Sequence, residues 1–229
     1  MRIKTLPSEK DLDILPAATL TGPYKDTTDP KHDNHNYSED LETAAEEADM
    51  PKLLSLLSLG ADVNSSTSLY GNPLQAAVVG GDPSIISKLL QHGADPNAHI
   101  ADFGTPLHSA AAWGKTEIVA LLLQNGAEIN GLAGEQGTPL QAAALENNTG
   151  MVSFLLGQGA NVNVSGGRLG SALQAAAAVG SVAIVKTLLS AGARVDAPAG
   201  SQGTALEAAR RGRHRELVGL LSSLERRKW

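Results

Sequence analysis

The sequence lacks cysteine altogether and contains few aromatic residues, only 3% of its 229 positions. Without cysteine it can form no disulfide and no thiolate metal site, which fits a reducing compartment. With so few rings, a core must be built from Leu, Ala, Val and Ile, and this favours closely packed helices over a β-sandwich. An all-α fold is therefore the first expectation.

Long apolar runs are also missing. No stretch approaches the roughly 20 apolar residues that cross a bilayer. Near the N-terminus, Glu9, Asp11 and Asp13 interrupt the segment in which a secretory signal would need its apolar run. We therefore expect an intracellular protein, in the cytoplasm, the nucleus or both, without a membrane partner.

Positive charge is scarce over most of the chain. The formal net charge is −6, and residues 41–204 carry six Lys or Arg against thirteen Asp or Glu. Only residues 205–229 are cationic, with seven basic against three acidic side chains. Because nucleic-acid binding needs a basic field, we expect no direct contact between the body of the protein and nucleic acid.

What the sequence does contain is a period of 33 residues, which indicates a repeat protein. One glycine column follows this period, at Gly71, Gly104, Gly137, Gly170 and Gly203. A leucine column keeps the same register, at Leu41, Leu74, Leu107, Leu140, Leu173 and Leu206. An alanine column does so too, at Ala44, Ala77, Ala110, Ala143, Ala176 and Ala209. The columns define six units with no insertion between them.

The unit at residues 104–136 shows how each repeat is expected to fold. Thr105 can cap a first helix that has Pro106 in its first turn, where the missing N–H costs nothing. Gly114 ends that helix, and Gly126 ends the second helix in a left-handed backbone conformation. The rest of the unit forms a polar, hairpin-like finger. Because one helix pair cannot bury both its faces, the units must stack.

The repeated motif resembles that of ankyrin repeats. Their Thr-Pro-Leu-His signature stands intact once, at residues 105–108, and a Gly-Ala-Asp-x-Asn turn occurs at residues 60–64 and 93–97. Related signatures stand at residues 72–75, 138–141, 171–174 and 204–207. In style the units look like ankyrin repeats of filamentous fungi. The resemblance implies an all-α ankyrin-repeat solenoid of about six 33-residue helix-turn-helix units with connecting β-hairpin-like fingers.

One departure from the family pattern concerns the histidine of the signature. Only His108 keeps it, and the other units have Gln or Glu at this position. The hydrogen bond between Thr and His that is usual in the family is therefore expected once.

The columns and the resemblance together predict three parts of the chain. Residues 1–38 show no repeat pattern and are expected to form an extended or disordered arm. Residues 39–225 form the ankyrin-repeat domain, and residues 226–229 form a basic tail. The expected units are 39–70, 71–103, 104–136, 137–169, 170–202 and 203–225, the first and last being polar caps.

Residue clusters that could carry catalysis are few, and each has a simpler interpretation. His32 and His35 could touch a metal, but no further ligands are evident, and a solvated arm is favoured. Residues 166–171 imitate a phosphate loop without its Lys, and the repeat period accounts for them. Residues 199–203 lack the first Gly of a nucleophile elbow. We therefore expect no enzyme, no metal, no cofactor and no small-molecule substrate.

Binding of another protein is the function that the resemblance implies. In the family, partners meet the finger tips and the exposed ends of the first helices, which together form a concave groove. Carried over by position, the first-helix residues are Val79, Ala112, Trp113, Leu145, Glu146, Val179 and Arg211. The finger residues are Ile100, Asp102, Leu132, Glu135 and Arg168. Trp113 is either a binding anchor at the centre of the groove or a cover for a neighbouring Gly or Ala inside the stack.

The specific hypothesis is a transcription co-regulator that binds a transcription factor without reading DNA itself. The fungal resemblance and the cationic C-terminal end favour it. The basic residues at 210–215 and 226–228 have two interpretations. They are a nuclear import signal or a contact with an acidic partner, or they belong to a solvated capping helix whose last-turn cations interact favourably with the helix dipole. The alternative function is a targeting or substrate-recognition subunit for a kinase, phosphatase or ubiquitin ligase, although no accessory motif for one is recognisable.

Overall fold

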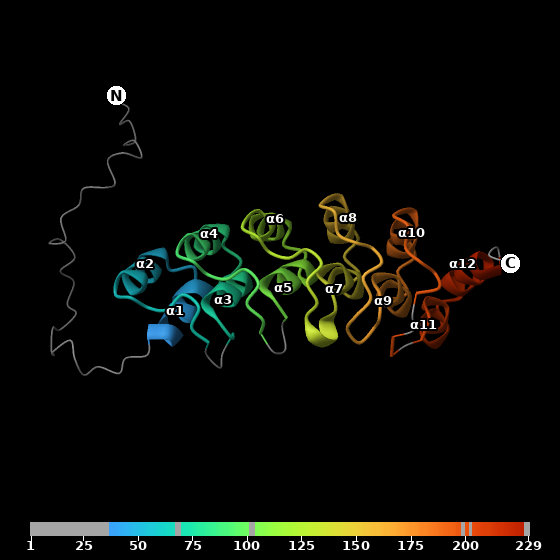
Figure 1. Ribbon diagram of the computed structural model, residues 1–229, viewed down its shortest axis with the longest axis horizontal. Helices are drawn as coiled ribbons and strands as arrows, with labels where there is room; N and C mark the ends of the chain where they lie inside the picture. The colour runs from blue at the N-terminus through green and yellow to red at the C-terminus, as the bar shows by residue number, and fades with distance from the viewer. Residues whose placement is uncertain (1–36, 67–69, 101–103, 198–199, 202, 227–229) are drawn as a thin grey trace, which may run out of the picture. The chain divides into compact units, whose positions relative to one another are not determined.

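The computed structural model describes residues 37–66, 70–100, 104–197, 200–201 and 203–226 (Figure 1). These residues form twelve α-helices in six consecutive pairs, and we call the members of each pair the first and the second helix. The pairs are α1 (Tyr37–Glu46) and α2 (Met50–Ser58), α3 (Pro73–Gly80) and α4 (Pro83–Gln91), α5 (Pro106–Ala112) and α6 (Thr116–Gln124), α7 (Pro139–Leu145) and α8 (Thr149–Gly157), α9 (Ala172–Val179) and α10 (Val182–Ser190), and α11 (Ala205–Arg211) and α12 (Arg215–Arg226). A short 3-10 turn, η2 (Gly134–Gln136), lies in one finger.

Both ends of the chain extend past the described residues. The arm predicted over residues 1–38 lies outside them except for its last two positions, and α1 already begins at Tyr37. Of the predicted basic tail, only Arg226 is described, as the last residue of α12. The predicted finger residue Asp102 lies outside the described residues as well.

The first helices begin alike because a capping residue recurs. In α3 the Asn72 carboxamide accepts a hydrogen bond from the Gln75 N–H at 2.8 Å, and Pro73 follows as the first helical residue. In α7 the Thr138 hydroxyl does the same for the Gln141 N–H at 3.3 Å. Each cap satisfies a backbone donor that has no partner within the helix.

Five of the second helices, α2, α4, α6, α8 and α10, are followed closely by a glycine that the backbone conformation requires. Gly126, which follows α6, has a φ of +90° and nothing within 4 Å of the place where a Cβ would stand. A side chain would therefore fit in this space, and glycine is required because of the left-handed backbone conformation.

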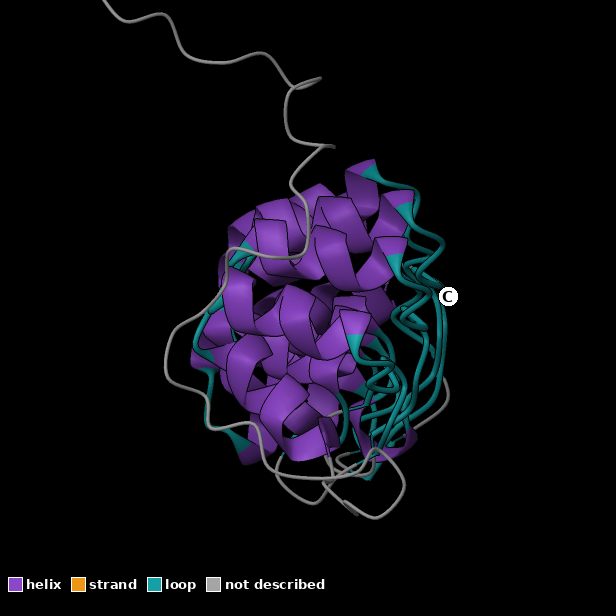
Figure 2. Ribbon diagram, turned by 90° about the vertical axis from the view of Figure 1, so that its left-hand side faces the viewer, coloured by secondary structure: helices purple, strands orange, loops and turns teal. Residues whose placement is uncertain are grey.

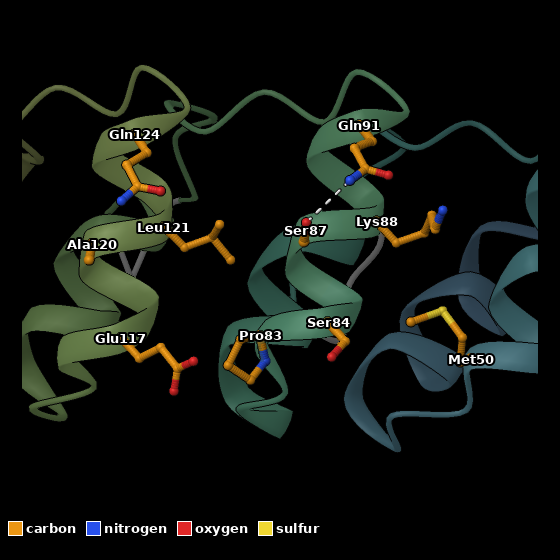
Figure 3. Close-up of a pocket in the computed structure, with 10 residues that line it drawn as sticks. All are labelled: Met50, Pro83, Ser84, Ser87, Lys88, Gln91, Glu117, Ala120, Leu121 and Gln124. Atoms are coloured by element: carbon orange, nitrogen blue, oxygen red, sulfur yellow. Dashed lines mark hydrogen bonds between the residues drawn. The ribbon is translucent and has the colours of Figure 1, made fainter. Parts of the chain in front are cut away.

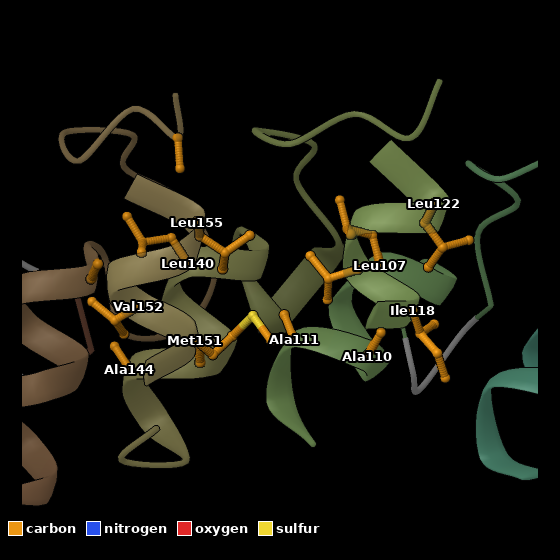
Figure 4. Close-up of a cluster of buried hydrophobic side chains, with 14 of the residues drawn as sticks. Leu107, Ala110, Ala111, Ile118, Leu122, Leu140, Ala144, Met151, Val152 and Leu155 are labelled. Carbon is orange, nitrogen blue, oxygen red and sulfur yellow. The ribbon is translucent and has the colours of Figure 1, made fainter. Parts of the chain in front are cut away.

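The first helices pack on one another in chain order, and they carry small residues where they meet (Figure 1). Ala110 and Ala143 are fully buried between units. At Gly80 a Cβ would lie only 2.1 Å from the carbonyl oxygen of Glu46, so the backbones of α3 and α1 touch. Leucines fill the layer between the first and second helices, and Figure 4 shows Met151 extending from α8 toward Ala111.

Polar side chains also tie each unit to the next. The Asn97 carboxamide donates to the Gly126 carbonyl at 3.0 Å and accepts from the Glu128 N–H at 2.8 Å. Asn64 and Asn163 repeat this pair of bonds one unit earlier and two units later. The asparagines of the turn thus form a ladder along the stack.

The fingers gather along one side of the helices (Figure 2). Within one finger, Ile100 and Gly104 exchange two backbone hydrogen bonds of 2.7 and 2.8 Å. In the part of the chain that the structure describes, β-structure is limited to isolated bridges of this kind. None of the described helices is long and apolar enough to cross a membrane.

Candidate protein-binding surface

The first helices present a row of side chains at their C-terminal ends. We call this row the first-helix strip: Val79, Ala112, Trp113, Leu145, Glu146, Val179 and Arg211. Val79, Ala112 and Leu145 are half-buried, whereas the other four side chains are exposed. The strip is therefore an accessible and mainly apolar row on helices whose opposite faces are locked in the core.

Trp113 is the largest side chain of the strip. It caps the C-terminus of α5 and is 46% exposed, so its ring lies at the surface of the stack. The Lys115 ammonium stands 5.4 Å from the ring centroid, within range of a cation–π interaction. One side of the indole therefore has a partner within the chain, while much of the ring remains accessible.

Lys115 is itself held by the preceding unit. Its Nζ donates to the carbonyl oxygens of Val78 at 2.8 Å and Val79 at 3.0 Å, near the C-terminal end of α3. A cation is favoured at this end of a helix dipole. Partial burial lowers the pKa of Lys115 from its ordinary value. Lys115 thus links Trp113 to the unit before it.

The described finger residues differ in their surroundings. Ile100 packs on Gly71, where an added Cβ would meet its side chain at 2.5 Å. Leu132 is 53% exposed and lies over Gly166 of the next finger. Ile100 thus helps to join neighbouring fingers, whereas Leu132 offers an apolar surface.

Glu135 and Arg168 occupy the same position in successive fingers, and both are exposed. The Arg168 N–H donates to the Glu135 carbonyl at 2.9 Å, and the Ser201 N–H donates to the Arg168 carbonyl at 2.9 Å. Backbone bonds therefore connect three consecutive fingers. This ladder was not predicted from sequence, although glycines at 134, 167 and 200 give a signal for the close approach that it needs.

A groove that sequence reasoning missed runs between the second helices α4 and α6 (Figure 3). It has a volume of about 610 Å³, and Met50 and Leu121 supply apolar side chains. Its only ionisable side chains are Lys88 and Glu117. A smaller groove of about 500 Å³ continues between α6 and α8, sharing Ala120 and Gln124.

Neither groove brings together the groups that catalysis needs. The 500 Å³ groove is lined by neutral side chains, and the larger one lacks His, Tyr and Asp. Throughout the described ranges, no cluster of three or more His, Asp or Glu side chains is arranged to hold a metal ion. These grooves offer contact surface and hydrogen bonds to a ligand, and no nucleophile paired with a base.

The helix pairs, their stacking and their fingers define an all-α repeat solenoid. A model of ankyrin repeats (3 copies) matches residues 41–133, 74–166 and 140–227. The chain therefore belongs to the ankyrin-repeat family, and it is a protein–protein interaction module. A comparison with curated proteins gives no match.

Proposed function

We propose that this protein is a non-catalytic regulatory adaptor that binds another protein through the first-helix strip. The observation that carries the proposal is the exposed Trp113 among apolar neighbours on packed helices. An accessible tryptophan on a rigid support loses little conformational entropy when it is buried by a partner, and it contributes a large contact area. We also propose that the predicted finger residues, Asp102 among them, contact the partner.

The most specific role that we propose is that of a transcription co-regulator. The acidic body argues against direct DNA binding, because phosphates would be repelled over most of the chain. The last unit instead has a group of four exposed arginines, Arg210, Arg211, Arg213 and Arg215. In this role the protein binds a transcription factor and needs no cofactor or small-molecule substrate.

A pull-down with matched variants tests the binding surface. The full chain is immobilised, and proteins retained from an extract of the source organism are compared with those retained by Trp113→Ala/Leu145→Ala. Leu59→Ala is the control, because Leu59 is an exposed leucine outside the strip. Partners should be lost from the double variant alone, while helical circular dichroism is preserved in all three proteins.

Equal retention by the wild type and the double variant would exclude the strip as the binding surface. Mass spectrometry of the specific partners then tests the role. Transcription factors support the co-regulator, whereas a kinase, phosphatase or ubiquitin-ligase subunit indicates a targeting or substrate-recognition subunit instead.

A further inference from the structure

We propose that the first-helix strip, together with Glu46 and Glu47 at the end of α1, takes an extended polypeptide segment whose charges are separated. Its basic residues face the first unit, and its acidic residues face Arg168 and Arg211. This inference rests on the proposed function and specifies the chemistry of the partner. It follows from how charge is distributed along two independent columns of the repeat.

The first column consists of the C-terminal ends of the first helices. At this end α1 carries Glu46, followed by Glu47, and α7 is followed by Glu146. The corresponding cation appears only in the last unit, as Arg211 at the end of α11. Between the first unit and the fourth, the strip is apolar around Trp113.

The second column consists of the finger tips. Glu135 stands on one finger, and Arg168 follows at the same position of the next. The backbone bond between these two residues keeps the fingers adjacent. The sign of the charge therefore changes from negative to positive in the same direction as in the helix column.

The charges of Glu46 and Arg211 are held by neighbouring groups. The Tyr70 hydroxyl donates to Glu46 Oε1 at 2.7 Å, and this hydrogen bond raises the pKa of Tyr70. The Arg211 guanidinium donates to the Ser201 carbonyl, in the finger that precedes α11, at 3.1 Å. Charges that are held before binding lose less entropy when a partner docks, so they contribute to selectivity.

The separation of the charges defines the length of the segment. Adjacent packed helices lie about 8–10 Å apart, so α5 and α11 are roughly 24–30 Å apart. An extended chain covers this span with about eight residues, at ~3.3 Å per residue. Two helix spacings separate α5 from α1, and an extended chain covers them with about five residues. The segment therefore carries an apolar anchor for Trp113, carboxylates about eight residues to one side and cations about five residues to the other.

A polypeptide is favoured over a nucleic acid by the acidic part of the surface. A phosphate backbone along this surface would be attracted at Arg168 and Arg211 but repelled at Glu46, Glu47, Glu135 and Glu146. A polypeptide can change the sign of its charge along its length, and a nucleic acid cannot.

The experiment is a selection from a phage library that displays random 16-residue peptides. The library is selected in parallel on the full-length wild type and on Trp113→Ala, with the folding of both verified by circular dichroism. The proposal expects peptides that are enriched on the wild type alone, with the charge order and spacing given above in either chain direction. Wild-type-specific peptides without charge separation would overturn the inference and leave the proposed function standing. Absence of any Trp113-dependent enrichment would overturn both.

A selected peptide then allows a direct measurement. By fluorescence anisotropy, Arg168→Glu/Arg211→Glu should weaken binding at least about tenfold, since two attractive contacts become repulsive. The matched control Arg168→Lys/Arg211→Lys keeps the charge and should stay within about threefold of the wild type. If both pairs of substitutions change the affinity equally, geometry rather than charge governs binding, and the inference is wrong.

Discussion

The Nε2 atom of His108 lies 2.9 Å from the carbonyl oxygen of Gly137, 29 residues further along the chain. A carbonyl oxygen can only accept, so Nε2 carries the proton. The other ring nitrogen, Nδ1, stands 2.8 Å from the Thr105 hydroxyl and 3.3 Å from its backbone nitrogen, and in the neutral ring it accepts. One buried side chain thus caps its own helix and joins its unit to the next.

Substitutions of His108 should show whether the fold needs its hydrogen bonds or the imidazole ring itself. His108→Ala leaves the Thr105 N–H without its acceptor, and the Gly137 carbonyl keeps only its bond from the Ala133 N–H. Together with the cavity left by the ring, this should lower the free energy of unfolding by roughly 2–4 kcal/mol. His108→Gln should cost about 1 kcal/mol or less, because Gln141 accepts from the Thr138 N–H and donates to a glycine carbonyl one unit on. Urea unfolding of both variants checks the difference. If His108→Ala and His108→Gln lower the free energy of unfolding equally, glutamine does not replace histidine at this position.

The same histidine should make the stability of the wild type depend on pH. Burial lowers the pKa of His108, so between its folded value and the ordinary value near 6.5 the unfolded chain binds more protons than the folded one. Its neutral form therefore supports the fold fully above about pH 6.5, and stability falls as the pH drops below that value. His108→Gln lacks this contribution. The free energy of unfolding, measured from about pH 8 to about pH 5, should fall less for this variant than for the wild type.

Most of the fold could be predicted from sequence because each repeated residue has a local task. Thr105, Pro106 and Gly126 act within their own unit, and the columns of Leu and Ala determine which faces are buried. The role of glutamine was not predicted. Only His108 was expected to bond with its capping threonine, whereas Gln141 makes the corresponding bond to the backbone of Thr138 and reaches the next unit as well.

The surface was harder to predict from sequence, because residues at the same repeat position can have different neighbours. Trp113 and Gly80, at the same position one unit earlier, are both exposed, but a side chain at Gly80 would collide with the carbonyl oxygen of Glu46. Whether a side chain fits at this position depends on how closely the preceding first helix approaches, and at Gly80 the backbone of α1 is in contact. The groove between α4 and α6 is likewise lined by residues of several units, and the repeat columns do not predict it.

Two helical glycines should respond in opposite directions to substitution by alanine. Gly157 in α8 has no positive φ and nothing within 4 Å of the place where a Cβ would stand, so Gly157→Ala should stabilise the protein by about 0.5–1 kcal/mol. Gly80→Ala would drive a methyl group into the Glu46 carbonyl and should destabilise it by about 1–3 kcal/mol. Thermal and urea unfolding measure both. A stabilising Gly80→Ala would show that α1 and α3 do not touch in this way.

The asparagine ladder should contribute to stability although it lies at the surface. Asn97→Ala removes two bonds between units, to Gly126 and from Glu128, and should lower the free energy of unfolding by about 1–2 kcal/mol. Asn125→Ala is the control, since the Asn125 carboxamide donates only to Leu121 of its own helix. That variant should stay within about 0.5 kcal/mol of the wild type. Hydrogen exchange adds a spatial test. Asn97→Ala should increase exchange at the Glu128 amide, because that N–H loses its acceptor. The amide that bonds to Asn163, two units away, should keep its protection. Uniform loss of protection along the stack would instead mean that the units unfold as one, and the ladder would then contribute to global rather than local stability.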